Sequence, residues 1–319
     1  MPSFRTGTVT DVLAQRDGLQ RVLVDGEPAY VLTELVGGVA VGDEVVVNTT
    51  AVDLGLGTGG WHVVHWNLSR REWSREGSGH ILKLRYTSLQ VDTGSAEEQG
   101  QPPLDLGGTP VVACFLHSQL PAVAVAFKAI APGRRLAYVM TDGGALPIAL
   151  SDTVADLRDR DLLDMTVTAG HAFGGDLEAV NVHSALLVAR GAGADAIVAA
   201  IGPGAVGTGT AYGHTGLDVV GVAEAARALG GRPIVALRVS DADPRPRHRG
   251  LSHHAREALG LLSRQPDAPV PDASTPDAAA LLAACGLSPT TMGRGPDEDR
   301  SFFQHAAAAG AAAARALAG

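Results

Sequence analysis

Hydrophobic and polar positions follow two patterns along the chain, and the change falls near residue 105. Up to that point, short hydrophobic or alternating runs are separated by turn residues such as Asp25-Gly26-Glu27-Pro28, a pattern typical of antiparallel strands. Runs of this kind predict a small β-barrel of the OB or SH3-like type. The expected strands cover residues 6–13, 21–24, 29–32, 44–48 and 61–66.

Residues 94–108 are polar and rich in Gly, Gln and Pro, which is typical of a linker or an exposed loop. We therefore assign residues 1–105 to the barrel with its linker and residues 106–319 to a second domain. Barrels of this size often bind nucleic acid, but the stretch lacks the stacking aromatic residues on a basic face that such binding needs. A structural or ligand-covering role is the favoured interpretation.

In the second domain, hydrophobic runs of strand length alternate with helical patterns. This alternation predicts the α/β class, with a mostly parallel, doubly wound, Rossmann-like sheet covered by helices on both faces. An extended connection at 265–298 carries one short helix at 277–284, and an Ala-rich helix is expected at 302–317. The expected strands cover residues 111–116, 136–140, 165–169, 196–201 and 234–239, and helices begin near 119, 146, 176 and 215 and after 250.

Each expected strand of this sheet is followed by a polar or Gly-rich segment. In a parallel sheet the carboxyl ends of the strands lie along one edge, and ligands bind in the crevice outside that edge. We therefore expect one shared site built from these five segments. They cover residues 117–119, 141–144, 170–176, 202–204 and 240–243.

The longest of these segments, residues 202–216, contains six glycines, which let a backbone turn sharply and approach a ligand closely. Such a loop between a strand and a helix is a common site for an anion or a nucleotide-like ligand. The spacing of its first three glycines formally matches the dinucleotide fingerprint, but it follows the fourth strand and not the first. We expect it to bind an anion through Gly202, Gly204, Gly207, Thr208, Thr210 and His214.

Acidic, imidazole and guanidinium groups crowd the segment after the last strand. Asp and His suit a divalent metal ion, and the candidate ligands are Asp241, Asp243, His248 and His253. The interspersed arginines suit a phosphate or carboxylate instead, and the candidates are Arg245, Arg247 and Arg249. A salt-bridged loop followed by a helix capped at Ser252 is the third interpretation. The sequence leaves the three open.

Three residues are candidates for proton transfer: His171, His254 and Asp142. Asp142 precedes two glycines, so it could equally be a turn former. His117 and Ser118 are adjacent, but adjacency does not make a catalytic dyad, and no Gly-x-Ser-x-Gly elbow occurs. A serine hydrolase is therefore disfavoured.

Composition narrows the choice of partner. A formal net charge of −9 argues against nucleic-acid binding, which needs a basic face. The N-terminal residues lack the apolar core of a signal peptide, and no apolar run approaches the ~20 residues that span a bilayer. We expect a soluble cytoplasmic protein with two reduced cysteines, Cys114 and Cys285, no membrane partner, and an Ala-rich helix that could support a homo-oligomer.

The blocks at 138–147, 170–184, 202–216 and 242–254 together resemble a bacterial family of α/β proteins of unknown function. The resemblance covers nearly the whole chain and implies a common fold. It implies no activity, so it assigns no catalytic residue.

These patterns lead to one function hypothesis and one rival. The hypothesis is an enzyme acting on a small anionic metabolite or nucleotide at the C-terminal edge of the sheet, with a divalent metal as a possible cofactor. The rival is a noncatalytic sensor or assembly protein that binds a ligand in the same crevice.

Overall fold

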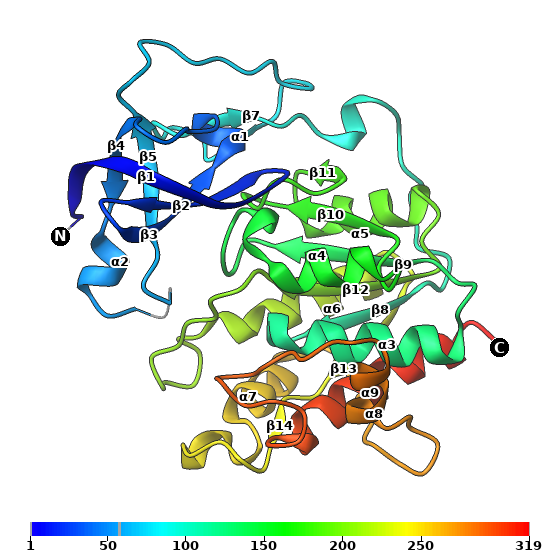
Figure 1. The fold of residues 1–319 in the computed structure, drawn as a ribbon. Helices are drawn as coiled ribbons and strands as arrows, with labels where there is room; N and C mark the ends of the chain where they lie inside the picture. Colours follow the sequence, from blue (N-terminus) through cyan, green and yellow to red (C-terminus); the bar gives the residue numbers. More distant parts are fainter. Residues whose placement is uncertain (1, 57–58, 319) are drawn as a thin grey trace. The chain divides into compact units, whose positions relative to one another are not determined.

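The computed structural model describes residues 2–56 and 59–318, which divide between Gly94 and Ser95 into two compact units (Figure 1). Residues 95–109 belong to the second unit because they are bound to it. The Ser95 hydroxyl lies 3.3 Å from the carbonyl oxygen of Glu178. The Leu106 side chain is fully buried, and its amide donates to the carbonyl of Leu229 at 2.7 Å.

The first unit is a closed five-stranded barrel with the strand order β1-β2-β3-β5-β4. All pairs are antiparallel except β3 with β5, which is the Greek-key arrangement of an OB-type barrel. Asp25 and Gly26 both have positive φ, as a two-residue hairpin turn between β2 and β3 requires. The predicted barrel is confirmed. Its strands are β1 (Phe4–Arg16), β2 (Leu19–Val24), β3 (Glu27–Leu32), β4 (Glu44–Asn48) and β5 (His62–Asn67).

Short elements complete this unit. Two single-turn helices, α1 (Thr33–Val36) and α2 (Thr50–Asp53), follow β3 and β4. A small antiparallel pair, β6 (Leu82–Lys83) and β7 (Val91–Asp92), lies near its end.

The second unit is built on a six-stranded, entirely parallel sheet with the order β11-β10-β9-β12-β8-β13. The five predicted strands are confirmed, and the edge strand β11 adds a sixth. The strands are β8 (Pro110–Cys114), β9 (Leu136–Thr141), β10 (Met165–Ala169), β11 (Leu177–Ala179), β12 (Ala196–Ile201) and β13 (Arg232–Ala236).

The prediction that a helix begins near residue 176 is wrong. Asp176 instead binds the strand beside it, because its carboxylate accepts from the Thr166 amide at 2.8 Å. The helix α5 (Val182–Gly191) begins after Asn181, whose side chain caps it by accepting from the Ser184 amide at 3.1 Å.

Helices cover both faces of this sheet, as a doubly wound fold requires. Alternate strand residues point to opposite faces, so Val112 and Val198 join one hydrophobic core and Val111 and Ile197 the other. The first core contains α3 (Leu120–Ile130), α4 (Asp152–Asp159), α8 (Ala278–Ala284) and α9 (Arg300–Arg315). The second contains α5, α6 (Asp218–Ala228) and α7 (His253–Leu261).

The Ala-rich helix α9 packs closely on α3 within the same unit. A Cβ atom on Gly310 would overlap with the carbonyl oxygen of Val123, so only a residue without a side chain fits there. Ten of the sixteen residues of α9 are buried, and most of these are alanines. The small side chains therefore allow α9 to pack closely on α3 of the same chain. The homo-oligomer stays a prediction.

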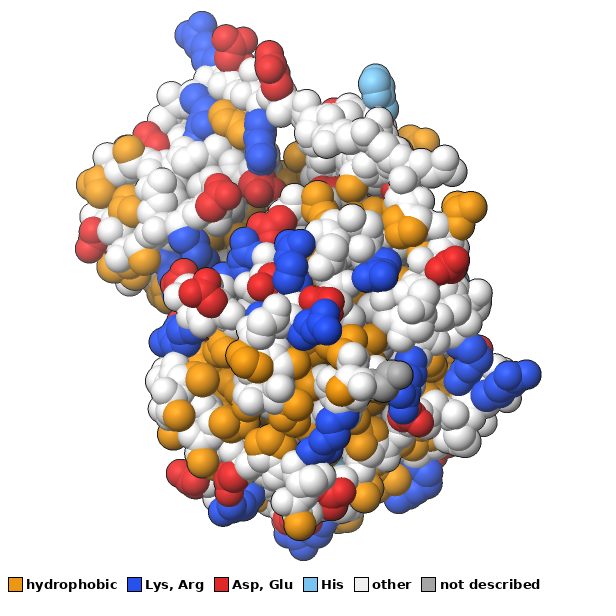
Figure 2. Space-filling view, turned by 90° about the vertical axis from the view of Figure 1, so that its right-hand side faces the viewer, with side chains coloured by type: hydrophobic (Ala, Val, Ile, Leu, Met, Phe, Trp, Pro, Cys, Tyr) orange, Lys and Arg blue, Asp and Glu red, His pale blue; other side chains and the backbone are white. Residues whose placement is uncertain are grey.

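The C-terminal end of α9 lies on the side that faces the viewer in Figure 2, where hydrophobic side chains gather among lysines and arginines. A groove of about 490 Å³ runs between this helix end and the turn after α3, lined among others by Ile130, Pro132 and Leu317.

Cys114 is buried and Cys285 partly buried, and both are free thiols. No helix in the described part of the chain has the length and apolar character needed to cross a membrane.

Candidate functional site

The segments that follow the parallel strands lie at one edge of the sheet, because every strand of that sheet runs in the same direction. Neighbouring segments are bonded to one another. The amide of Ala145, after β9, donates to the carbonyl of Pro203, after β12, at 2.7 Å. The amide of His171, after β10, donates to the Asp142 carboxylate at 2.9 Å.

The Gly-rich segment after β12 folds back on itself as a short hairpin. The amide of Thr208 donates to the Gly213 carbonyl at 2.8 Å, and the amide of Thr215 donates to the Val206 carbonyl at 3.0 Å. The hydroxyls of Thr208 and Thr210 lie 2.9 Å apart and bond within the hairpin. The two threonines therefore stabilise the loop, and their side chains are not the ones that reach inward.

Four buried histidines pack together, one of them in this hairpin. His214 comes from the hairpin, His248 from the single turn η5 (Pro246–His248), and His253 and His254 from the first turn of α7. The rings of His214 and His254 stack with centroids 3.7 Å apart and planes 8° from parallel. The His253 ring is 4.3 Å from that of His254, although the two side chains are consecutive on a helix.

Arginines surround the histidines. The Arg238 side chain is only 6% exposed, and its Nη1 donates to Nδ1 of His254 at 2.9 Å. Arg247 is exposed, and its Nε donates to Nε2 of His248 at 3.3 Å. Arg245 makes two hydrogen bonds, at 2.9 and 2.7 Å, to the carboxylate of the buried Asp243.

A cavity of about 80 Å³ lies between the hairpin and these basic residues. Val206, Gly207 and Thr215 line it from the hairpin side. Five basic residues also line it: Arg238, Arg245, Arg247, His248 and His254. The cavity therefore brings a glycine backbone, three guanidinium groups and two imidazoles together.

The hydrogen bonds assign the protons on two of the imidazoles. Arginine can only donate, so Nδ1 of His254 carries the lone pair and its Nε2 carries the hydrogen. A Cβ atom built on Gly207 would lie 3.4 Å from that Nε2, so this N–H faces the loop that lines the cavity. By the same reasoning Nε2 of His248 accepts from Arg247, and its Nδ1 donates to Ser252 at 2.8 Å.

Burial and neighbouring charge keep the histidines neutral. Burial, with His214 and Arg238 close by, holds the pKa of His254 far below its usual range. Burial and the Arg238 guanidinium lower the pKa of His248 to about 3. Burial, together with Arg245, also lowers the pKa of Arg238 to about 10. At pH 7 the arginines are charged and these histidines are neutral.

A metal ion does not fit this donor set as it is arranged. One nitrogen from each of His248, His253 and His254 lies within 4.8 Å of the others, which is the only such grouping among the described residues. However, the lone pairs of His254 and His248 already accept from Arg238 and Arg247, and three positive guanidinium groups line the same cavity. The geometry favours an anion.

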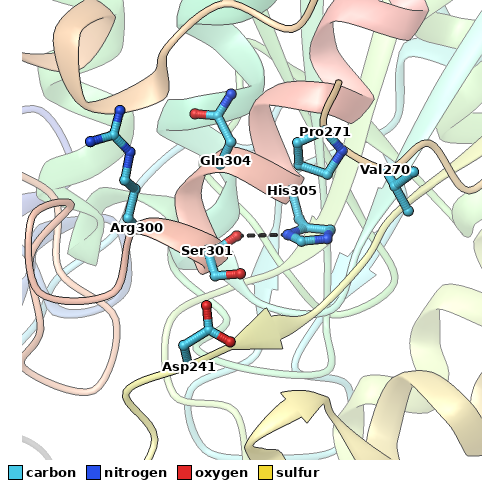
Figure 3. Close-up of a pocket in the computed structure, with 7 residues that line it drawn as sticks. All are labelled: Asp241, Val270, Pro271, Arg300, Ser301, Gln304 and His305. Carbon is cyan, nitrogen blue, oxygen red and sulfur yellow. Dashed lines mark hydrogen bonds between the residues drawn. The ribbon is translucent and has the colours of Figure 1, made fainter. Parts of the chain in front are cut away.

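The acidic residues of the predicted metal set are also placed elsewhere. Asp243 is paired with Arg245 and lies 3.5 Å from Arg294. Asp241 is exposed and lines a different pocket of about 400 Å³, together with Arg300, Ser301 and His305 (Figure 3). In that pocket Nδ1 of His305 donates to the Ser301 carbonyl at 2.8 Å. The structure does not bring Asp241 together with His248 and His253.

Of the three residues predicted to transfer protons, only His254 lines the cavity. His171 and Asp142 lie together at the ends of β10 and β9. Among the predicted loop and arginine ligands, Gly207, Arg245 and Arg247 line the cavity, whereas Gly202, Gly204, Thr208, Thr210, His214 and Arg249 do not.

His117 has a structural role in the fold. Its Nδ1 lies 3.0 Å from the hydroxyl of Tyr138, and its Nε2 lies 2.7 Å from the hydroxyl of Ser151. Ser118 bonds to Thr291 at 3.3 Å and is not paired with the imidazole beside it. The expectation that 117–118 form no dyad agrees with this arrangement.

Sequence reasoning missed Arg238, which has the most buried guanidinium in the cavity wall. The available signal was a lone arginine inside the hydrophobic run at 234–239. The stacking of His214 on His254 was not predicted either. It depends on the hairpin that carries His214, and the backbone bonds that form this hairpin cannot be read from the sequence.

The family model described as "Protein of unknown function (DUF3866)" matches residues 28–281. The chain therefore belongs to this family, and the resemblance noted from its sequence blocks is confirmed. Neither a curated protein nor a solved structure matches the chain.

Proposed function

We propose that this protein is an enzyme that acts on a small anionic metabolite or nucleotide, bound at the C-terminal edge of the parallel sheet. The observation that carries the proposal is the cavity beneath Gly207, where the guanidinium groups of Arg238, Arg245 and Arg247 meet the N–H edge of His254. Guanidinium groups are the side chains best suited to bind phosphate and carboxylate oxygens.

His254 is the candidate acid–base residue. Its Nδ1 is held by Arg238, which orients the ring, and its Nε2–H is left to donate to a bound substrate. An anion in the cavity would offset the positive field of the arginines and so raise the pKa of His254 toward the range in which a histidine exchanges protons at neutral pH.

The alternative is a sensor that binds the same anion without converting it. The separation of His171 and Asp142 from the cavity favours this alternative, because it leaves one predicted proton-transfer residue at the site.

A thermal-shift panel tests binding first. Phosphate, sulfate, sugar phosphates, nucleotides and carboxylates are added separately, and a ligand at about 100 times its Kd should stabilise the fold by about 2.7 kcal/mol. A protein that no anion stabilises would contradict the proposal.

Each stabilising ligand is then followed by chromatography for turnover. The variant His254→Asn keeps an acceptor for Arg238 but removes the Nε2–H, so it should bind the ligand and lose turnover. Stabilisation without turnover in the natural protein would support the sensor. Undiminished turnover in His254→Asn would remove His254 from the chemistry.

A further inference from the structure

We propose, on the basis of the function proposed above, that the group bound in the cavity is a doubly charged tetrahedral oxyanion: the phosphoryl group of a phosphate monoester. Such a group carries more negative charge than a carboxylate and the opposite charge to a divalent metal ion, so binding experiments at the cavity can tell the three classes apart.

The charges around the cavity favour a dianion. Arg238, Arg245 and Arg247 line the cavity, and Arg294 lies beside Asp243. Among the described residues, only two carboxylates, those of Asp243 and Asp299, pair with any of these four arginines. Within the described ranges, Arg238 and Arg247 have no carboxylate within ion-pair distance. Glu257 interacts with His214 and His253, and in the described part of the chain it forms no ion pair with any of the four arginines.

The cluster therefore has an excess of about two positive charges, counted as four guanidinium groups less two carboxylates. Arg238 is 6% exposed, and a buried charge without a counter-charge is costly. A dianion supplies the missing charge in full, whereas a carboxylate supplies half of it.

The donors that line the cavity come from separate elements: Arg238 follows β13, Arg247 belongs to η5, His254 begins α7, and Gly207 belongs to the hairpin. Donors that surround a small space suit oxygens pointing to the corners of a tetrahedron. A planar carboxylate needs donors in one plane, as in the fork of a single arginine.

The size and rim of the cavity suit a monoester. A volume of about 80 Å³ holds one oxyanion group and not a whole nucleotide. Val206 and Met292 line the cavity and are 66% and 64% exposed, so they offer an apolar rim to the organic part of the ligand outside.

The experiment is an isothermal titration of the full chain at pH 7.5 with four probes: inorganic phosphate, sulfate, acetate and zinc chloride. Phosphate and sulfate should bind, and acetate should bind at least about tenfold more weakly, because it offers one charge in place of two. Zinc should not bind at the cluster.

Two matched variants locate the site. Arg247→Gln removes an exposed guanidinium that lines the cavity, and phosphate affinity should fall by about tenfold or more. Arg249→Gln removes an exposed guanidinium of the same segment that does not line the cavity, and affinity should change by less than about twofold. Thermal unfolding of each variant without ligand checks that the fold is retained.

The outcomes separate this inference from the function it rests on. If acetate binds as tightly as phosphate and both affinities fall in Arg247→Gln, the cavity binds anions but does not select a tetrahedral dianion, and the inference is wrong. Zinc binding that disappears in His253→Ala would overturn it in favour of a cation. If phosphate affinity falls equally in Arg247→Gln and Arg249→Gln, the anion is attracted by the overall positive charge of the segment and not bound in the cavity, and the inference is wrong. Failure of every anion to bind would overturn the proposed function as well.

Discussion

Acid should destabilise the second unit through His117, a histidine that the candidate chemistry does not use. The imidazole is 9% exposed and is held between the hydroxyls of Tyr138 and Ser151 at 3.0 and 2.7 Å. Burial lowers its pKa from 6.5 to about 4. The folded protein therefore keeps His117 neutral at a pH where the unfolded chain binds a proton.

The sign and size of the effect follow from this difference. Because the folded pKa lies below the unfolded one, the neutral form contributes stability that is fully present above pH 6.5. That stability is lost as the pH falls from 6.5 to about 4. The interval of about 2.5 pH units corresponds to roughly 3 kcal/mol of unfolding free energy.

Urea unfolding of the natural chain and of His117→Gln, measured between pH 7.5 and 4.5, isolates this contribution. The other buried histidines titrate in both proteins, so their effect cancels in the difference. Glutamine keeps a donor for Ser151 but cannot be protonated. The variant should be the less stable protein at pH 7.5, and its deficit should shrink by about 2–3 kcal/mol by pH 4.5. A deficit that stays constant with pH would show that His117 has the same pKa in both states and would refute the reasoning.

Two glycine substitutions test the packing around the site. A Cβ atom on Gly144 would overlap with backbone oxygens of the facing loop, so Gly144→Ala should destabilise the fold by about 1–3 kcal/mol in chemical denaturation. Gly221→Ala, in the open middle of α6, should stabilise it by about 0.5–1 kcal/mol, and equal effects would contradict the loop contact. Gly207→Ala would place a methyl group 3.1 Å from Cβ of His214 and 3.4 Å from Nε2 of His254, so phosphate affinity should fall by about tenfold while the unfolding free energy falls by only about 1 kcal/mol. Unchanged affinity would mean that the ligand does not lie against the hairpin.

Much of the second unit could be predicted from hydrophobic pattern alone. Long connections between apolar runs force parallel strands, and parallel strands place their carboxyl ends at one edge, so the position of the five segments along that edge followed from topology. The cavity itself takes no residue from the predicted segments 141–144, 170–176 and 240–243. Edge strand β11 escaped prediction because it has three residues, and no periodicity can be read from so short a run.

The inner arrangement of the site could not be predicted in the same way. Arg238 reaches His254 because a two-residue antiparallel pair, β14 (Val239–Ser240) and β15 (Gly250–Leu251), folds the intervening segment back. The amide of Ser252 then donates to the Arg238 carbonyl at 2.9 Å, which starts α7 beside the end of β13. The same fold-back turns Asp241 toward another pocket. Such a path depends on tertiary contacts, which local sequence does not encode.

The most direct test of the anion site is a crystal of the full chain soaked in tungstate, a tetrahedral dianion whose anomalous signal is unmistakable. The account predicts an anomalous peak in the cavity, within hydrogen-bond distance of Arg238 and of Nε2 of His254 and beneath the Gly207 backbone. An empty cavity in a crystal that holds tungstate elsewhere would contradict the central claim.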